Sequence, residues 1–250
     1  MEEKLKAFER TLKIMDDLRA KCPWDMKQTT HSLRNLTIEE TFELADAIIE
    51  DDVKGIKEEV GDIMLHMVFY SKIAEEKQWF DISDALNDLC DKLISRHPHI
   101  YGDTEVSGEE EVKQNWEKLK LKEGKKSVLG GVPKSLPAMV KAYRMQEKTA
   151  QVGFEWDNLD HVWDKVEEET EELKEAIDLD AADKIEEEIG DLFFALINYS
   201  RFLNVDPETA LEKTNKKFKA RFEYIESKAP KSLTEMTLEE MDKLWEEAKN

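Results

Sequence analysis

Two sets of four carboxylates stand at the same spacing in the two halves of the chain. The members of the first and second set, in order, are Glu40, Glu43, Glu59 and Asp62, then Glu169, Glu172, Glu188 and Asp191. Each residue of the second set lies 129 positions after its counterpart in the first. Acidic groups held together repel one another unless a cation lies between them, and Mg²⁺ is usually held by a few carboxylates together with substrate phosphates. The spacing therefore predicts magnesium-dependent chemistry on a phosphate compound.

Helices must position these acids, because residues three apart lie on neighbouring turns of one helix face. The pair Glu40–Glu43 and the pair Glu59–Asp62 then each project from one helix face. A short connection favours antiparallel packing of the two helices, which would bring all four acids together. Gly61 and Gly190 sit inside the second helix of each set, and a mid-helix glycine costs about 1 kcal/mol relative to alanine. We therefore expect close backbone packing beside the acids.

The duplication extends beyond the acids and predicts two tandem domains. Apolar residues at helical spacing predict helices over about residues 2–20, 32–50 and 53–77, another from 81 onward, and a shorter one around Trp116. No segment alternates like a strand. Glycine and proline cluster between 121 and 136, which is typical of a linker. The expected fold is all-α, with two tandem helical-bundle domains at 1–122 and 137–250 and a linker at 123–136.

Composition excludes several classes of protein. The net charge of −21 lacks the basic footprint of nucleic-acid binding and disfavours an anionic membrane surface. The first residues lack the apolar stretch of a signal peptide, and the longest apolar stretches are too short to span a bilayer. The two cysteines, Cys22 and Cys90, occupy non-equivalent places in the two halves and suggest no disulfide framework. We expect a cytoplasmic protein.

A solvated acidic face is the competing interpretation of the acids, and it covers part of 167–172 and 186–188. In the first half, however, the acids adjoin apolar residues of a core face, where acids are rarely buried unless paired or bound to metal. Di-iron helical bundles use Glu-x-x-His pairs, and none of the five histidines follows a glutamate by three residues. A ligand set made only of oxygens suits Mg²⁺ or Mn²⁺.

Basic and aromatic residues recur in both halves as candidates for contacts with a nucleotide. The candidates for phosphate contacts are Lys92, Arg96 and Lys120, with Lys217, Arg221 and Lys249 in the second half. The tryptophans that offer a flat surface to a base are Trp24, Trp116, Trp156 and Trp245. Surface charge and core packing are the respective alternatives.

These motifs together resemble the tandem-domain MazG proteins, members of the all-α nucleoside triphosphate pyrophosphohydrolases. The segments that carry the resemblance are 22–33, 38–47, 58–62, 96–99, 166–172, 187–191 and the segment around Trp245. The resemblance implies a homodimer that hydrolyses NTPs and dNTPs to the monophosphate and pyrophosphate with Mg²⁺. It places the metal ligands on the two acid sets.

The leading acids of the same motif fall on Glu39 and Glu168, which are our candidates for orienting or deprotonating the attacking water. Trp116 and Trp245, with the six basic residues, are the candidates for holding the base and phosphates. Two alternatives stay open. One is a narrower hydrolase of the dUTP or dCTP type, and the other is a helical interaction module whose acids are only a solvated face.

Overall fold

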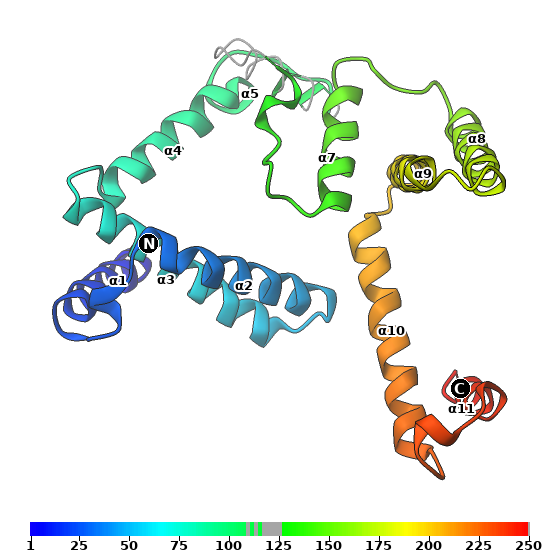
Figure 1. The fold of residues 1–250 in the computed structure, drawn as a ribbon. Helices are drawn as coiled ribbons and strands as arrows, with labels where there is room; N and C mark the ends of the chain where they lie inside the picture. Colours follow the sequence, from blue (N-terminus) through cyan, green and yellow to red (C-terminus); the bar gives the residue numbers. More distant parts are fainter. Residues whose placement is uncertain (109–110, 113–114, 117–126, 250) are drawn as a thin grey trace. The chain divides into compact units, whose positions relative to one another are not determined.

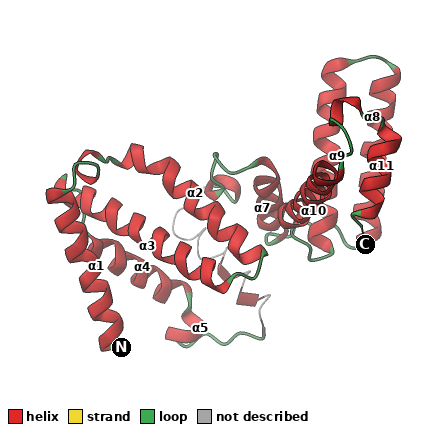
Figure 2. Ribbon diagram, turned by 90° about the horizontal axis from the view of Figure 1, so that it is seen from below, coloured by secondary structure: helices red, strands yellow, loops and turns green. Residues whose placement is uncertain are grey.

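The computed structural model of the chain describes residues 1–108, 111–112, 115–116 and 127–249 (Figure 1). This part of the chain contains helices and loops and no strand (Figure 2), so the all-α prediction is confirmed. No helix in it is both long and apolar enough to cross a membrane. The chain divides into two compact units, Met1–Glu105 and Val106–Asn250, called unit 1 and unit 2 below. The boundaries at 122 and 136 stay a prediction, and residues 117–126 lie outside the described part.

Unit 1 is built around a helical hairpin. Its helices are α1 (Glu2–Lys21), α2 (Thr30–Ile49), α3 (Val53–Glu76), α4 (Ile82–Arg96) and α5 (Pro98–Tyr101), with a short 3₁₀ helix η1 (Asp25–Lys27). The helices α2 and α3 lie side by side in both views (Figures 1 and 2), and α1 packs against α3. The three-residue connection between α2 and α3 produces the antiparallel pair that the sequence favours.

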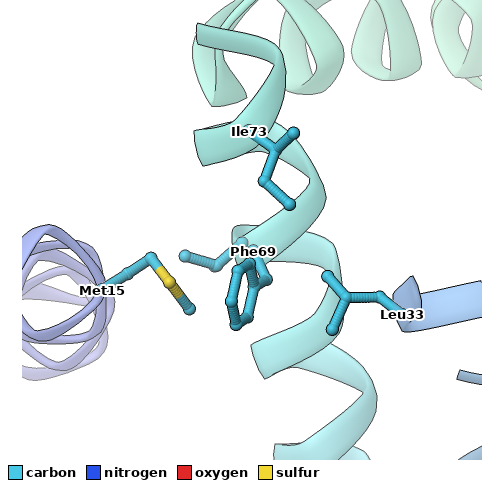
Figure 3. Packing of buried hydrophobic residues seen from close by; sticks show 5 residues of the cluster. Met15, Leu33, Phe69 and Ile73 are labelled. Atoms are coloured by element: carbon cyan, nitrogen blue, oxygen red, sulfur yellow. The ribbon is translucent and has the colours of Figure 1, made fainter. Parts of the chain in front are cut away.

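A small core fixes the three helices of unit 1 to one another. Met15 of α1, Leu33 of α2, and Phe69 and Ile73 of α3 point toward a common centre (Figure 3). Val68 completes this buried cluster. Arg19 adds a polar clamp, because its guanidinium donates to the carboxylate of Glu76 and to the backbone carbonyls of η1 and the loop after it. These contacts hold the start of α2 against the end of α3.

Unit 2 repeats the hairpin. Its helices are α7 (Ala138–Ala150), α8 (Leu159–Asp178), α9 (Ala182–Phe202), α10 (Pro207–Lys228) and α11 (Leu238–Glu247), with 3₁₀ helices η2 (Leu129–Gly131) and η3 (Leu233–Glu235). The helices α8 and α9 form the hairpin, α7 packs against α9, and α10 packs against α11.

Matching turns of the two units have the same backbone conformation. Asp51 and Asp180, 129 positions apart, occupy the two hairpin turns with φ of 53° and 52°. Gln78 and Asn204, which follow α3 and α9, have φ of 58° and 56°. Such left-handed residues are uncommon outside glycine, although Asp and Asn tolerate them. The two hairpins therefore share the conformations of their connections as well as the positions of their acids.

Candidate metal centres

The first acid set converges between α2 and α3. Glu40 and Glu43 from α2 and Glu59 from α3 each offer a carboxylate oxygen, and these three oxygens lie within 4.8 Å of one another. Glu40 and Glu59 are half-buried, whereas Glu43 is exposed. The antiparallel hairpin thus places carboxylates from two helices around one point.

The environment of the first set disfavours negative charge. Burial raises the pKa of Glu59, and the charges of Glu43 and Glu40 raise it further. Burial is also the largest cause of the raised pKa of Glu40, followed by the charges of Glu43 and Asp62. The Oε2 atom of Glu59 is buried and has no hydrogen-bond partner among the described residues. A hard divalent cation would neutralise this repulsion and satisfy the buried oxygen, so the residues fit such an ion.

The second acid set has the same form between α8 and α9. Glu169, Glu172 and Glu188 each offer an oxygen within 4.8 Å of the other two. The side chains of Glu169 and Glu188 are buried, at 5% and 8% exposure. Burial, followed by the charge of Glu172, raises the pKa of Glu188. Glu172 is exposed, as are the neighbouring acids Glu167 and Glu187, so a solvated face does not describe Glu169 and Glu188 but does describe these neighbours.

Two lysines that the sequence analysis missed lie in the second set. Lys165 reaches Glu169 at 2.6 Å and Glu168 at 3.0 Å, and the hydrogen bond to Glu169 is the largest cause of its raised pKa. Lys184 lies 3.1 Å from Glu187 and 3.8 Å from Glu188. The signal was available, since Lys165 and Lys184 each precede a ligand acid by four residues, the spacing of helical ion pairs.

The first set lacks these lysines. The residues 129 positions before Lys165 and Lys184 are Leu36 and Gly55. Unit 2 therefore neutralises part of its acid set with its own ammonium groups, and unit 1 has no cation at the equivalent positions.

The predicted fourth members, Asp62 and Asp191, lie near these groups but are not part of either convergent trio. The charge of Asp62 acts on Glu40 and Glu59, and that of Asp191 acts on Glu188. Asp62 is half-buried and Asp191 is exposed. Their role as ligands stays a prediction.

Comparison with known proteins places both acid sets within one kind of domain. The model of the MazG nucleotide pyrophosphohydrolase domain matches residues 28–101 and 159–225, which together make up more than half of the chain. The chain belongs to the MazG family. Each matched segment contains one complete acid set, so the duplication is a pair of MazG domains, as the resemblance implied.

Full-length relatives agree with this assignment. The chain is 45% identical to the nucleoside triphosphate pyrophosphohydrolase/pyrophosphatase MazG of Thermotoga maritima, over 97% of this chain and 95% of that protein. It is 40% identical to the nucleoside triphosphate pyrophosphohydrolase of Escherichia coli K12, over 97% of both chains. It is also 42% identical to the uncharacterized protein YabN of Bacillus subtilis, over 99% of this chain and 53% of that protein.

The leading acids of the MazG motif, Glu39 and Glu168, are exposed beside their acid sets. Glu168 contacts Lys165, as described above. Glu39 precedes the first ligand acid of α2 by one position, and Glu168 precedes that of α8 by one position. Both side chains are open to solvent.

The glycines inside the two ligand helices do not mark close backbone packing in this MazG chain. A Cβ atom added at Gly61 or at Gly190 would meet nothing within 4 Å beyond its own helix. Both residues are exposed. The expectation of a helix packed tightly against these glycines was wrong, because the partner helix of each hairpin covers a different face.

Two of the predicted phosphate and base contacts of unit 2, Arg221 of α10 and Trp245 of α11, lie against one another. The Arg221 guanidinium lies 5.4 Å from the centre of the Trp245 ring, which also packs against Phe218 at 5.2 Å. Lys217 is exposed on α10, and Lys249 pairs with Glu246. Within the described residues, no hydrogen bond or ion pair joins this cluster to the acid set.

The corresponding candidates in the first half of the sequence are Lys92, Arg96, Trp116 and Lys120, of which the last two lie beyond the end of unit 1 at Glu105. Lys92 is exposed on α4, and Arg96 is the half-buried last residue of the same helix. Trp116 is half-buried, and Lys120 lies outside the described residues.

Cys22 and Cys90 are both free thiols, in agreement with the expectation of no disulfide.

Proposed function

We propose that this MazG protein hydrolyses nucleoside triphosphates and their deoxy forms to monophosphates and pyrophosphate at the two acid sets, with Mg²⁺ as the metal. Family membership sets the class of reaction, and the names of the Thermotoga and Escherichia relatives suggest the class of substrate. The observation that carries the proposal is the convergence of three carboxylate oxygens within 4.8 Å in each unit.

The acid sets supply an all-oxygen site that suits Mg²⁺, and Mn²⁺ accepts the same donors. The proposed ligands are Glu40, Glu43, Glu59 and Asp62 in unit 1, and Glu169, Glu172, Glu188 and Asp191 in unit 2. When bound, the ion neutralises phosphate oxygens and lowers the pKa of a water molecule. The protein then has mainly to position the triphosphate and the water, because phosphoryl transfer asks little covalent chemistry of it.

Glu39 and Glu168 are the proposed groups that orient or deprotonate the attacking water. Their exposure next to the acid sets supports this role, since a water molecule can reach both carboxylates. Lys165, which lies 3.0 Å from Glu168, holds this carboxylate beside the acid set of unit 2.

Basic side chains would hold the triphosphate. Lys165 and Lys184 contact the carboxylates of Glu169 and Glu188. When those carboxylates bind a cation instead, the ammonium groups become available to phosphate oxygens. The sequence candidates for further phosphate contacts are Lys92, Arg96, Lys120, Lys217, Arg221 and Lys249, and those for base contacts are Trp116 and Trp245.

Exposed apolar side chains support the proposal that two copies of the chain associate. Five of them, each at least 40% exposed, are Phe42 on α2, Val60 and Met64 on α3, and Ile189 and Phe193 on α9. Contiguous exposed apolar surface commonly marks an interaction site. Light scattering should give twice the chain mass of 29.2 kDa, and a monomer would exclude the homodimer. The lack of nucleic-acid or membrane partners stays a prediction from the charge, and the cytoplasmic location stays a prediction from the two cysteines.

Product analysis tests the proposed reaction. The chain is mixed with Mg²⁺ and each of a panel of ribo- and deoxyribonucleoside triphosphates, and the products are separated by chromatography. We expect monophosphate and pyrophosphate in equal amounts from several nucleotides. Release of orthophosphate together with the nucleoside diphosphate would contradict cleavage between the α- and β-phosphates. Turnover of dUTP or dCTP alone would favour the narrower hydrolase.

A further inference from the structure

Two ammonium groups contact the buried acids of the trio in unit 2. The Nζ atom of Lys165 lies 2.6 Å from Oε1 of Glu169, whose side chain is only 7% exposed. The Nζ atom of Lys184 lies 3.8 Å from Oε1 of Glu188, whose side chain is 10% exposed. Both acids belong to the convergent trio. The ammonium groups therefore lie at the carboxylates that would hold a divalent ion.

An ammonium group and a divalent ion compete for these carboxylates. Surroundings of low dielectric strengthen the attraction between an ammonium group and a buried carboxylate. They strengthen equally the repulsion between an ammonium group and a divalent ion on the same carboxylate. A free Mg²⁺ ion must also lose water, which it does reluctantly. Binding of a free ion by this trio therefore requires that the two lysines give up their contacts.

Both lysines can change partner without a change of fold. The side chains of Lys165 and Lys184 are 35% and 62% exposed, and each pairs with an acid four residues further along its own helix. The oxygens of a triphosphate are strong acceptors for such ammonium groups. A nucleotide that binds with the ion thus gives the displaced lysines new partners, which a free ion does not.

The trio of unit 1 has no such competitor at the matching positions. Leu36 and Gly55 stand where unit 2 has its two lysines. The neighbours whose charges act most on Glu40 and Glu59 are other carboxylates. The three glutamates of unit 1 therefore carry three formal negative charges, whereas the two lysines reduce the net charge of the equivalent group in unit 2 to one.

We propose that Lys165 and Lys184 weaken the binding of a free divalent ion to the acid set of unit 2, so that this set takes up the ion together with a triphosphate; this rests on the proposed function. The acid set of unit 1 binds the ion without nucleotide. The affinities for ion and nucleotide are therefore coupled through the lysines in unit 2, and such coupling acts equally in both directions. At an ion concentration between the two affinities, unit 1 is loaded and unit 2 becomes loaded when substrate binds.

Binding of Mn²⁺ without nucleotide tests the role of the lysines. Electron paramagnetic resonance of free Mn²⁺ gives the dissociation constant in a full-length chain carrying Glu43→Gln with Glu59→Gln, so that unit 2 is the site observed. In this chain, Lys165→Met should tighten Mn²⁺ binding at least about tenfold, because it removes the ammonium group beside the trio. Lys174→Met is the matched control on the same helix. Lys174 and its partner Glu171 are both exposed, so this change should alter the constant by less than about twofold.

A gain of affinity distinguishes this role from a merely structural one, because a loss of packing would weaken the site. Lys184→Met should also tighten binding, by a smaller factor, since its ammonium group lies farther from the acid. A chain carrying Glu172→Gln with Glu188→Gln reports unit 1, and it should bind Mn²⁺ at least about tenfold more tightly than the chain that reports unit 2. Thermal melts check that each variant is folded.

The coupling to nucleotide is measured with the α,β-methylene analogue of ATP, which resists cleavage between the α- and β-phosphates. Equilibrium dialysis gives the factor by which Mn²⁺ raises the affinity of the chain that reports unit 2 for this analogue. We expect Lys165→Met to reduce the factor by roughly tenfold, because Mn²⁺ then binds the empty site more tightly.

Unchanged Mn²⁺ affinity in folded Lys165→Met, or binding of free Mn²⁺ by unit 2 as tight as by unit 1, would overturn the inference. Loss of folding in Lys165→Met leaves Lys184→Met to decide. Failure of the proposed function has a different signature, because no pyrophosphate would then be released from any nucleotide by the unmodified chain.

Discussion

At the scale of single residues, the two acid sets differ in their counter-charges. Lys165 and Lys184 contact the acids of unit 2, and Leu36 and Gly55 stand at the equivalent places in unit 1. The three convergent carboxylates of unit 1 therefore repel one another with no lysine at these two positions. Protons or a divalent ion would relieve this repulsion.

The pH dependence of stability follows from the raised pKa values of Glu40 and Glu59. These groups retain protons in the folded state at a pH where the unfolded chain, with a pKa of 4.5, has lost them. Stability from this source is thus present below pH 4.5 and falls as pH rises through the raised values. We expect Mg²⁺ to raise the melting temperature more at about pH 8 than at about pH 5. An equal rise at both pH values, measured by differential scanning fluorimetry, would argue against relief of this repulsion.

Arg19 links α1 to the end of α3 and to the segment before α2. Arg19→Met keeps much of the packing but removes the hydrogen bonds to Glu76 and to the backbone near η1, so we expect a loss of about 1–3 kcal/mol in urea unfolding. Lys21→Met is the matched control, because its pair with Asp17 is exposed and should be worth less than about 1 kcal/mol. Equal effects of the two variants would show that the Arg19 clamp is unimportant.

At the scale of elements, periodicity predicted the helices well because apolar stripes reflect local packing. The observed α1, α2 and α3 begin and end within about two residues of the expected ranges, the usual precision of helix limits. The acids converge because residues three apart share a helix face, which the sequence also reveals.

The glycines show where this local reasoning failed. A costly mid-helix glycine suggested a neighbouring backbone, but the space beside Gly61 and Gly190 is open. We therefore expect Gly61→Ala and Gly190→Ala each to raise the free energy of unfolding of the metal-free chain by about 0.5–1 kcal/mol. Chemical denaturation measures this. Destabilisation by either variant would mean that a contact such as a second copy of the chain occupies that space.

At the scale of the whole molecule, the chain contains two MazG domains whose sites carry different side chains. Both units have a trio of convergent acids, whereas the lysines belong to unit 2, where two of the acids, Glu169 and Glu188, are buried. The duplication could be read from the sequence, because the two acid sets are offset by 129 positions throughout. The difference between the two units could not be read from the sequence, because it depends on which side chains become buried in the folded chain.

This inequality predicts unequal contributions to turnover. Glu172→Gln should reduce pyrophosphate release from ATP by more than roughly tenfold, since it removes one proposed ligand from the better equipped site. Glu43→Gln, the same change at the matching position, should have a smaller effect. Initial rates at saturating Mg²⁺ measure both variants. A larger loss in Glu43→Gln would place the main site in unit 1.

The central claim is that convergent carboxylates in both units hold the metal on which pyrophosphate release depends. Its most direct test is the rate of pyrophosphate release from ATP in Mg²⁺ by the full-length double variant Glu43→Gln with Glu172→Gln, with circular dichroism to confirm its helices. We predict a folded protein without measurable release. A folded double variant that releases pyrophosphate at the rate of the unmodified chain would contradict the assignment.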